Sequence, residues 1–179
     1  MFAEFYDRLT SGGSLLYSWQ SGGGGAFIGN FFNYMCSPFS LLVFIFGRAN
    51  IPEAIAAMIF LKCVLASFTF SLFISRKSDR SSPAVSAFGV LYSCSAWFVA
   101  YYWNVMWLDA FYLFPLVMLG IEKLVHEKKC ALYTLSLAFT LITNYYMGYM
   151  VCIFSVIYYF CTILLVKDND GEKTVLPKS

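Results

Sequence analysis

Charged residues are scarce in this chain of 179 residues. Asp, Glu, Lys and Arg together make up 12%, whereas hydrophobic residues make up 60%. A soluble domain has about twice that share of charge and only about half of its residues apolar. The composition therefore favours an integral membrane protein. The formal net charge of +2 indicates no particular partner, and no run of Lys or Arg is long enough to predict nucleic-acid binding.

Several motifs for metal, nucleotide and hydrolytic chemistry are also missing. None of the six cysteines forms a CxxC pair, so neither a zinc site nor a redox motif is indicated. The only histidine, His126, is expected at a cytoplasmic helix end, so it cannot complete a Ser-His-Asp triad at an external site. The glycine-rich segment 21–25 lacks the Lys and Ser/Thr of a P-loop. The first residues do not have the pattern of a signal peptide.

Long apolar runs dominate what is present. A helix needs about 20 apolar residues to cross the roughly 30 Å core of a bilayer. Five segments are predicted as membrane helices: 54–74, 83–102, 108–125, 130–143 and 147–166. The expected fold class is all-α, a polytopic bundle of about five transmembrane helices over residues 51–166. An external loop with interfacial helices precedes it (1–50), and a polar tail expected to be disordered follows it (167–179).

Residues 26–46 allow two interpretations. They carry no charge and are long enough to span a membrane, but Gly29, Asn30, Asn33 and the Ser-Pro pair at 37–38 divide them. We interpret them as interfacial or re-entrant helices on the outer leaflet. If they cross instead, the N-terminus is cytoplasmic and the external loop is lost.

Basic residues predict the orientation of the bundle. They gather in the loop after the first predicted span, in the loop after the third, and in the tail: Arg76, Lys77 and Arg80; Lys123, Lys128 and Lys129; Lys167, Lys173 and Lys178. By the positive-inside rule these segments are cytoplasmic. The N-terminal loop, Asp109 and Asn144 are then expected on the outer side, and the C-terminal tail in the cytoplasm.

The segment 103–109 places Asp109 and two indoles between apolar runs. Asp109 is a candidate base that deprotonates an acceptor hydroxyl, or a ligand that holds a divalent cation near a phosphate. The alternative is that it only caps a helix beginning at Ala110. Trp103 and Trp107 suit a wall that stacks on sugar, but an interfacial aromatic belt explains them more simply.

Lys62 lies near the middle of an apolar span, so its ammonium must face protein or water. It is a candidate for binding a lipid-linked phosphate or for pairing with an acidic residue. The alternative is a structural pair with a carboxylate outside this chain. Asn144 and Tyr145 form a polar turn that either contacts substrate or only reverses the chain. Trp19 either lines an outer cleft or is buried at the surface.

Three segments and the Ser-Pro pair carry a family resemblance. The segments are Ser11-Gly-Gly-Ser-Leu-Leu-Tyr-Ser-Trp19, Asn104-Val-Met-Trp-Leu-Asp109 and Thr143-Asn-Tyr-Tyr-Met-Gly-Tyr149. Together they resemble the YfhO family of bacterial membrane proteins over nearly all of residues 1–166. The resemblance implies a GT-C glycosyltransferase architecture in the bacterial cytoplasmic membrane. It also implies transfer of a sugar from a polyprenyl-phosphate carrier to a teichoic-type or other cell-envelope polymer.

The resemblance raises Asp109 as the catalytic candidate. The candidate substrate-binding residues are Lys62, Asn104, Trp103, Trp107, Asn144, Tyr145 and Trp19. No resident metal is assigned, although a divalent cation stays an alternative. The expected partners are membrane lipids, the lipid-linked sugar and the polymer acceptor, with no nucleic acid.

One departure from the family pattern affects the expected activity. Family members begin with a further membrane helix and an external Asp expected to be the main catalytic residue. This chain starts after that point, and neither Glu4 nor Asp7 matches the motif position. The chain therefore resembles an N-terminal fragment, expected to be inactive without the remainder of the protein. The rival hypotheses are a transporter or flippase for a lipid-linked or polar solute, with Lys62 as its midplane site, and an inactive remnant.

Overall fold

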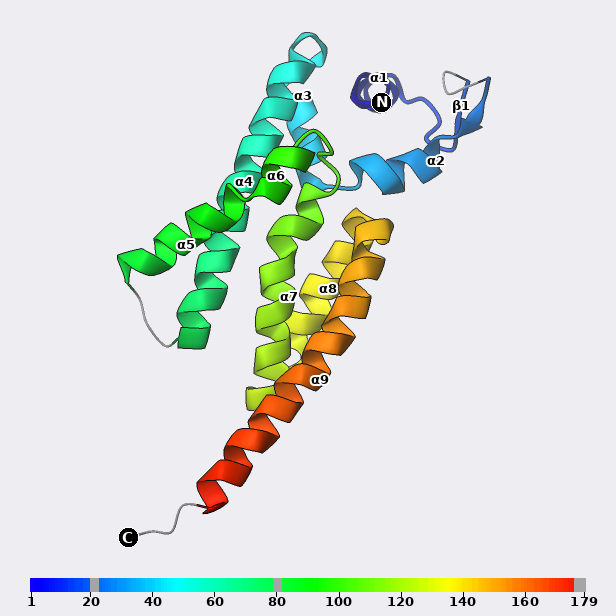
Figure 1. Cartoon of the computed structure of the whole chain (residues 1–179). Coiled ribbons are helices and arrows are strands. Elements are labelled where there is room, and N and C mark those ends of the chain that lie inside the picture. The colour runs from blue at the N-terminus through cyan, green and yellow to red at the C-terminus, as the bar shows by residue number, and fades with distance from the viewer. Residues whose placement is uncertain (20–22, 79–81, 176–179) are drawn as a thin grey trace.

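The computed structural model describes residues 1–19, 23–78 and 82–175, with side chains as far as residue 165. Nearly all of the described chain is helical (Figure 1). The elements before residue 51 are α1 (Phe2–Ser11), β1 (Tyr17–Ser18), β2 (Gly25–Ala26), α2 (Phe27–Asn30), η1 (Phe31–Met35), η2 (Pro38–Leu41), α3 (Leu42–Phe46) and η3 (Arg48–Asn50). The elements after it are α4 (Ile51–Ser78), α5 (Pro83–Ser93), α6 (Ala96–Tyr101), α7 (Leu108–Glu127), α8 (Ala131–Thr143) and α9 (Tyr145–Val175).

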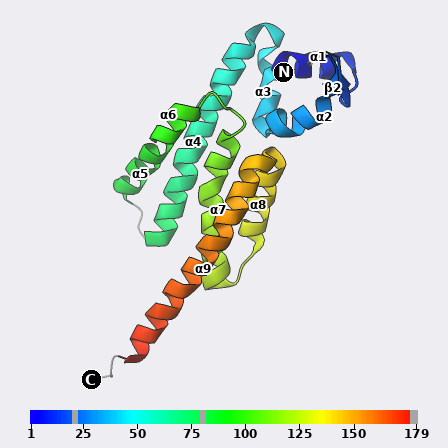
Figure 2. The same cartoon turned by 45° about the vertical axis from the view of Figure 1, so that its right-hand side comes forward.

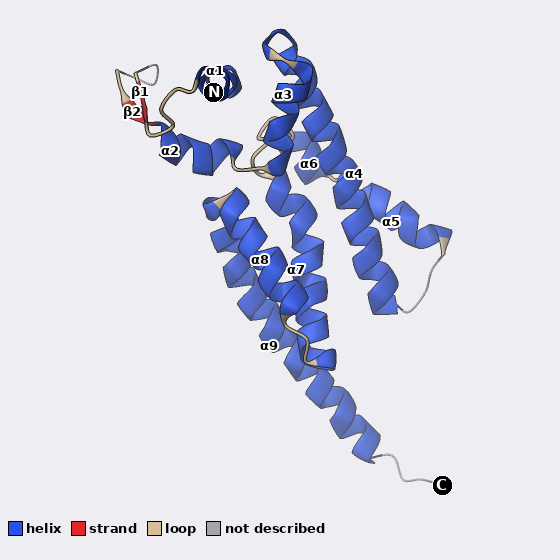
Figure 3. Ribbon diagram, turned by 180° about the vertical axis from the view of Figure 1, so that it is seen from behind, coloured by secondary structure: helices blue, strands red, loops and turns tan. Residues whose placement is uncertain are grey.

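The elements before residue 51 form a separate layer, which we call the N-terminal layer, at one end of the bundle built by α4 to α9 (Figures 1 and 2). The bundle end that carries this layer also holds the starts of α4, α7 and α9 and the end of α8 (Figure 3). The opposite end holds the ends of α4 and α7 and the start of α8. The described segments predicted to be external therefore share one end, and the basic residues in the last turns of α4 and α7 lie at the other.

A sharp bend shapes the N-terminal layer. The helical pairs Phe27–Met35 and Pro38–Phe46 meet at an angle of 106°. Cys36 and Ser37 form the break, where proline at the next position disfavours continuation of a helix. Phe5 of α1 forms a buried hydrophobic cluster with Phe27 and Met35. The bend confirms the predicted division at 37–38, and it fits a broken span or a re-entrant loop, so the choice between crossing and interfacial placement stays a prediction.

α4 has one inward face made of a mixed set of side chains. The buried residues Ala54, Met58, Lys62, Ala66 and Thr69 recur every three or four positions, which places them on one stripe. Phe60, Val64 and Phe68 lie on the opposite face and are exposed. An apolar outer face with small or polar residues inside is the pattern of a helix that contacts lipid. Lys62, the only lysine in the interior of α4, therefore faces the rest of the bundle.

α5 and α6 cover α4 and α7 from one side. The Ser82 hydroxyl accepts a hydrogen bond from the Ala84 amide and Pro83 occupies the first turn, which confirms Ser82 as the predicted N-cap. Stacked rings join four helices: Phe70 on Tyr92 at 4.4 Å, Tyr92 on Phe111 at 4.4 Å, and Trp97 on Phe111 at 4.9 Å between ring centroids. The Tyr92 hydroxyl donates to the Phe111 carbonyl at 2.9 Å.

The helix predicted over 83–102 is divided into α5 and α6 at Cys94 and Ser95.

α7 is the central helix, because it packs against α4, α8 and α9. Glycines allow α8 to approach both α7 and α9 closely. A Cβ on Gly120 of α7 would lie 2.6 Å from the Tyr133 backbone in α8. A Cβ on Gly148 of α9 would lie 2.9 Å from Leu141 in α8. Small residues at crossings are how membrane helices gain contact where lipid offers no hydrophobic driving force.

A helix covers each predicted span, although the span 83–102 is divided into α5 and α6 and α9 extends beyond residue 166. Three stretches are long and apolar enough to cross a membrane (Arg48–Ser78, Pro83–Tyr101 and Tyr145–Leu165), or four if the bent pair is one span. α7 has more charged residues and α8 has only 13 residues, so neither meets that criterion. The tail predicted to be disordered from residue 167 is instead helical as far as Val175, because α9 continues past its apolar run.

Gly120→Ala tests the crossing of α7 and α8. The added methyl group meets rigid backbone of Tyr133, so we expect the unfolding free energy to fall by about 1–3 kcal/mol. Thermal unfolding in detergent measures this change. Gly29→Ala is the matched control, since a Cβ there meets no atom within 4 Å. Equal destabilisation by both substitutions would contradict the close-packing argument.

Candidate functional site

Lys62 and Asp109 form an ion pair in the interior of the bundle. The Nζ of Lys62, from the α4 stripe, lies 2.7 Å from Oδ2 of Asp109 in the first turn of α7. The side chains are 1% and 0% exposed, respectively. A lone charge among apolar groups is very costly, so each of these groups requires the other. The pair thereby fixes which face of α4 meets the start of α7.

Two further hydrogen bonds and one aromatic ring surround the pair. Lys62 also donates to the Val105 carbonyl at 2.9 Å, in the turn before α7. Ser37, at the bend of the N-terminal layer, donates to Oδ1 of Asp109 at 2.8 Å. The Phe39 ring lies 5.8 Å from the ammonium, within cation–π range. The layer therefore closes over the pair, and its bend supplies one of the carboxylate's ligands.

This geometry corrects three sequence-based interpretations. Asp109 was expected to meet an acceptor hydroxyl on the outer side, but its side chain is fully buried under the N-terminal layer. The capping alternative is also wrong, because α7 begins at Leu108 and has no side-chain cap. The partner of Lys62 was placed outside the chain in one alternative, whereas it is Asp109. The ion pair explains the first and third corrections, since a carboxylate paired with an ammonium need not face water.

Asn144 joins the bundle to the N-terminal layer. Its amide nitrogen donates to the Asn33 carbonyl in η1 at 3.2 Å, and its Oδ1 accepts from the Met147 amide at 2.9 Å in the first turn of α9. The residue is 1% exposed. The polar turn that the sequence predicts thus has an architectural role in this structure. A contact with substrate stays a prediction.

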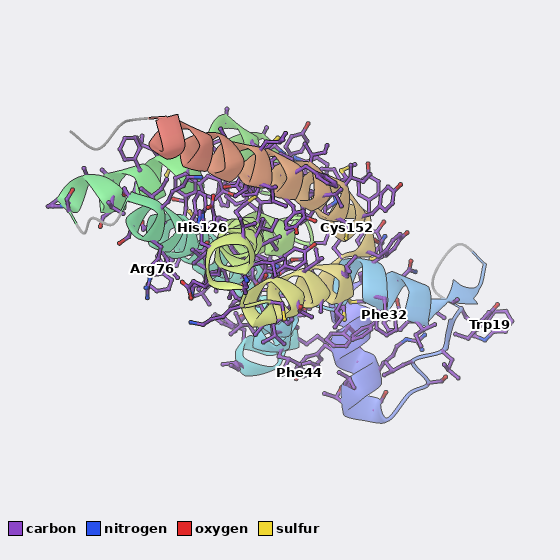
Figure 4. The ribbon with its side chains drawn as sticks, turned by 90° about the horizontal axis from the view of Figure 1, so that it is seen from below. Trp19, Phe32, Phe44, Arg76, His126 and Cys152 are labelled. Carbon is purple, nitrogen blue, oxygen red and sulfur yellow. The ribbon has the colours of Figure 1, made fainter. Side chains whose placement is uncertain are left out.

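The aromatic candidates occupy the same end of the molecule but do not form one wall. Trp107 lies near the Tyr101 and Tyr146 rings, at 5.5 and 6.5 Å between centroids. Trp103 and Tyr145 are largely exposed, while Asn104 is buried. Trp19 is 78% exposed, contacts the Tyr17 ring in an edge-to-face arrangement, and projects from the far side of the N-terminal layer (Figure 4). The structure therefore brings Lys62 and Asp109 together and leaves Trp19 apart.

Two partners of the pair were not identified from the sequence. Ser37 is 72 positions from Asp109 and was noted only as part of a helix break. Tyr112 is one turn after Asp109 on α7, and its side chain interacts with the same carboxylate. The i,i+3 spacing to Asp109 was the available signal for Tyr112. A lone serine before proline gives no signal for Ser37.

The surroundings of Asp109 do not fit a divalent cation as arranged. A magnesium or calcium site needs several oxygen ligands around the ion. The two oxygens of Asp109 are taken by the Lys62 ammonium and the Ser37 hydroxyl. Among the described residues, no group of three His, Cys, Asp or Glu side chains is placed to hold a metal.

Comparison with known proteins gave one family match. The model of the family described as "Bacterial membrane protein YfhO" matches residues 1–177, nearly the whole chain. Neither the curated proteins nor the solved structures gave a match.

Neutralising one member of the pair tests its structural role. Lys62→Met leaves a buried carboxylate, and Asp109→Asn leaves a buried ammonium, so each should cost about 3–5 kcal/mol of unfolding free energy. The double variant Lys62→Met/Asp109→Asn removes both charges and should recover most of that loss. A double-mutant cycle from thermal unfolding in detergent measures the coupling. Lys128→Met, an exposed cation, is the control, and a double variant as unstable as the two losses added would contradict the pairing argument.

Proposed function

The chain belongs to the YfhO family of bacterial membrane proteins, and from this premise we propose that it forms part of a GT-C type membrane glycosyltransferase. The reaction is transfer of a sugar from a polyprenyl-phosphate carrier to a cell-envelope polymer, such as a teichoic-type polymer. It takes place on the outer face of the cytoplasmic membrane, with Asp109 as the base. The observation that carries the proposal is the Lys62–Asp109 pair enclosed between the bundle and the N-terminal layer.

The distribution of charge supports an outer location for this pair. Arg76, Lys77 and Lys123 lie at the opposite end of the bundle from the N-terminal layer. Cytoplasmic loops are the ones enriched in Lys and Arg. Under this rule the layer, Asp109 and Asn144 lie on the side where lipid-linked sugars are used outside the cell.

The pair provides both charges that the proposed reaction requires. The carrier phosphate competes with Asp109 for the Lys62 ammonium, which binds it as a point charge. Asp109 is then free to accept the proton of the acceptor hydroxyl while that oxygen attacks the anomeric carbon. The bond from this carbon to the phosphate oxygen breaks, and the phosphate leaves with its negative charge next to Lys62. The displacement inverts the anomeric centre and needs no further reactant.

An apolar groove beside the first turns of α7 suits the polyprenyl chain. The groove has a volume of about 380 Å³ and lies between α5, α6, α7 and α9. Its lining includes Trp97, Phe111, Met150 and Phe154, and it reaches Ala110, the residue after Asp109. A carrier whose first isoprene units lie here would place its phosphate near the end of α7 that holds the carboxylate.

A transporter is the second candidate, favoured by the same ion pair. Charged residues within membrane helices commonly mark solute or ion pathways, and Lys62 lies in a helix long enough to span. An assay in sealed vesicles distinguishes the enzyme from the transporter. The vesicles contain the protein as the cell makes it, and labelled polyprenyl-phosphate sugar is added to them. Transfer or release of the sugar supports the enzyme. Movement of the intact lipid without bond cleavage supports the transporter and contradicts our proposal.

The folded, charge-free variant Lys62→Met/Asp109→Asn tests the catalytic role of the pair. We expect the transfer rate to fall by more than about 100-fold, because general base catalysis contributes about 10²–10⁴. Thermal unfolding of the same preparation shows that the loss is not one of folding. Transfer at the wild-type rate in this stable variant would refute the proposed role of Asp109.

Filling the groove tests the carrier site. Met150→Trp should raise the KM for the polyprenyl-phosphate sugar several-fold by occupying space between α6 and α9, with kcat nearly unchanged. Ile153→Trp is the matched control, because Ile153 is exposed on the same helix but does not line the groove. Equal KM values for the two variants would place the carrier elsewhere.

A further inference from the structure

A polar cavity, distinct from the apolar groove, lies at the end of the bundle opposite the N-terminal layer. Its volume is about 460 Å³, and it opens between the last turns of α4 and α7. Arg76, Lys77 and Lys123 line it, together with the carboxylates of Glu122 and Glu127. Arg76 and His126, which also lines the cavity, lie far from Trp19 in Figure 4. The lining shares no residue with the contacts of Lys62 and Asp109, which lie toward the other end of α4 and α7, so the cavity is separate from that site.

Both carboxylates of the cavity already have partners of their own. Glu122 accepts from Lys77 at 2.7 Å and from the Tyr158 hydroxyl of α9, and His126 lies 3.3 Å from its other oxygen. Glu127 is paired with Lys129 at 2.8 Å, and this hydrogen bond holds the pKa of Glu127 below its usual value. The acidic groups are thus engaged at the walls of the cavity.

Arg76 and Lys123 are the cations with capacity to bind a ligand. Within the described part of the chain, neither forms a salt bridge or a side-chain hydrogen bond, and their charges act on Glu127 only at longer range. Arg76 is exposed, and Lys123 is half-buried. One comes from α4 and the other from α7, so the two cations face one opening from different helices.

We propose that this cavity binds the phosphate of an anionic lipid headgroup. It lies where the apolar stretch Arg48–Ser78 ends, which is the depth of headgroups if α4 spans the membrane. Basic pockets between membrane helices on the cytoplasmic side are suited to such headgroups. The volume lies within the range of about 300–1,000 Å³ typical of ligand pockets, and Leu119 adds an apolar wall. Arg76 offers a planar fork of donors, and Lys123 a point charge.

The position of the cavity gives the bound lipid a structural effect. Lys77, Glu122 and Tyr158 connect α4, α7 and α9 directly beside it. A phosphate between Arg76 and Lys123 bridges α4 and α7 and reduces repulsion among the cations. Anionic lipid should therefore stabilise this end of the bundle. The inference does not depend on the chemistry proposed for Asp109.

Lipid titration of the purified protein tests the site. Phosphatidylglycerol added to protein in neutral detergent should raise the Tm, whereas phosphatidylcholine should not. In Arg76→Gln/Lys123→Gln the lipid concentration for half of this effect should increase, by roughly five-fold for each removed cation. Lys128→Gln removes one positive charge at the same end but outside the cavity, and should behave as wild type.

Two further outcomes decide the assignment. Inorganic phosphate shares the phosphate oxygens but has no acyl chains, so it should need a far higher concentration than the lipid to raise the Tm. If it acts as strongly as the lipid and the double variant abolishes that effect, the site binds free phosphate and the lipid assignment is wrong. An unchanged lipid effect in the double variant, or an equal loss in Lys128→Gln, overturns the site itself.

Discussion

The buried attraction between Lys62 and Asp109 is the constraint on which the arrangement of this molecule depends. Neither charge can be left alone in an apolar interior, so α4 must turn the stripe containing Lys62 toward the first turn of α7. The contact also sets how far along α4 the start of α7 lies. The N-terminal layer then closes the remaining side through Ser37 and Phe39. Three parts of the chain thus meet at one ionic contact.

The packing around this contact is that of a membrane bundle with its polarity inside. α4 exposes Phe60 and Phe68 while it buries Ala66 and Thr69, and glycines set the closest approaches of α7, α8 and α9. Rings rather than charges join α5 and α6 to the bundle, through the stack from Phe70 to Trp97. The second connection between α4 and α7, Lys77 to Glu122, lies at the opposite end. Two polar contacts therefore align two helices that run in the same direction.

Local signals in the sequence were enough to predict most helices. Ser82 and Pro83 mark the start of α5 because they supply the cap and the first-turn geometry, and apolar length marks α4 and α9. The cost of an unpaired ammonium required that Lys62 face protein or water. The identity of its partner was not predictable, because Asp109 lies 47 positions away and the adjoining indoles suggested an exposed surface. Trp19 was grouped with the site because it lies in the predicted outer loop, but its position depends on the short hairpin of β1 and β2.

The bend in the N-terminal layer has a thermodynamic consequence. Ser37 lies at the vertex, and its hydroxyl reaches Asp109 only while the two arms keep their angle. Ser37 and Lys62 donate to the same carboxylate, so the angle of the arms and the Lys62 contact are linked equilibria, and each affects the other to the same extent. A molecule that draws Lys62 away from the carboxylate would therefore alter the stability of the layer above it. A change in the angle of the layer would, reciprocally, alter the affinity of Lys62 for such an anion.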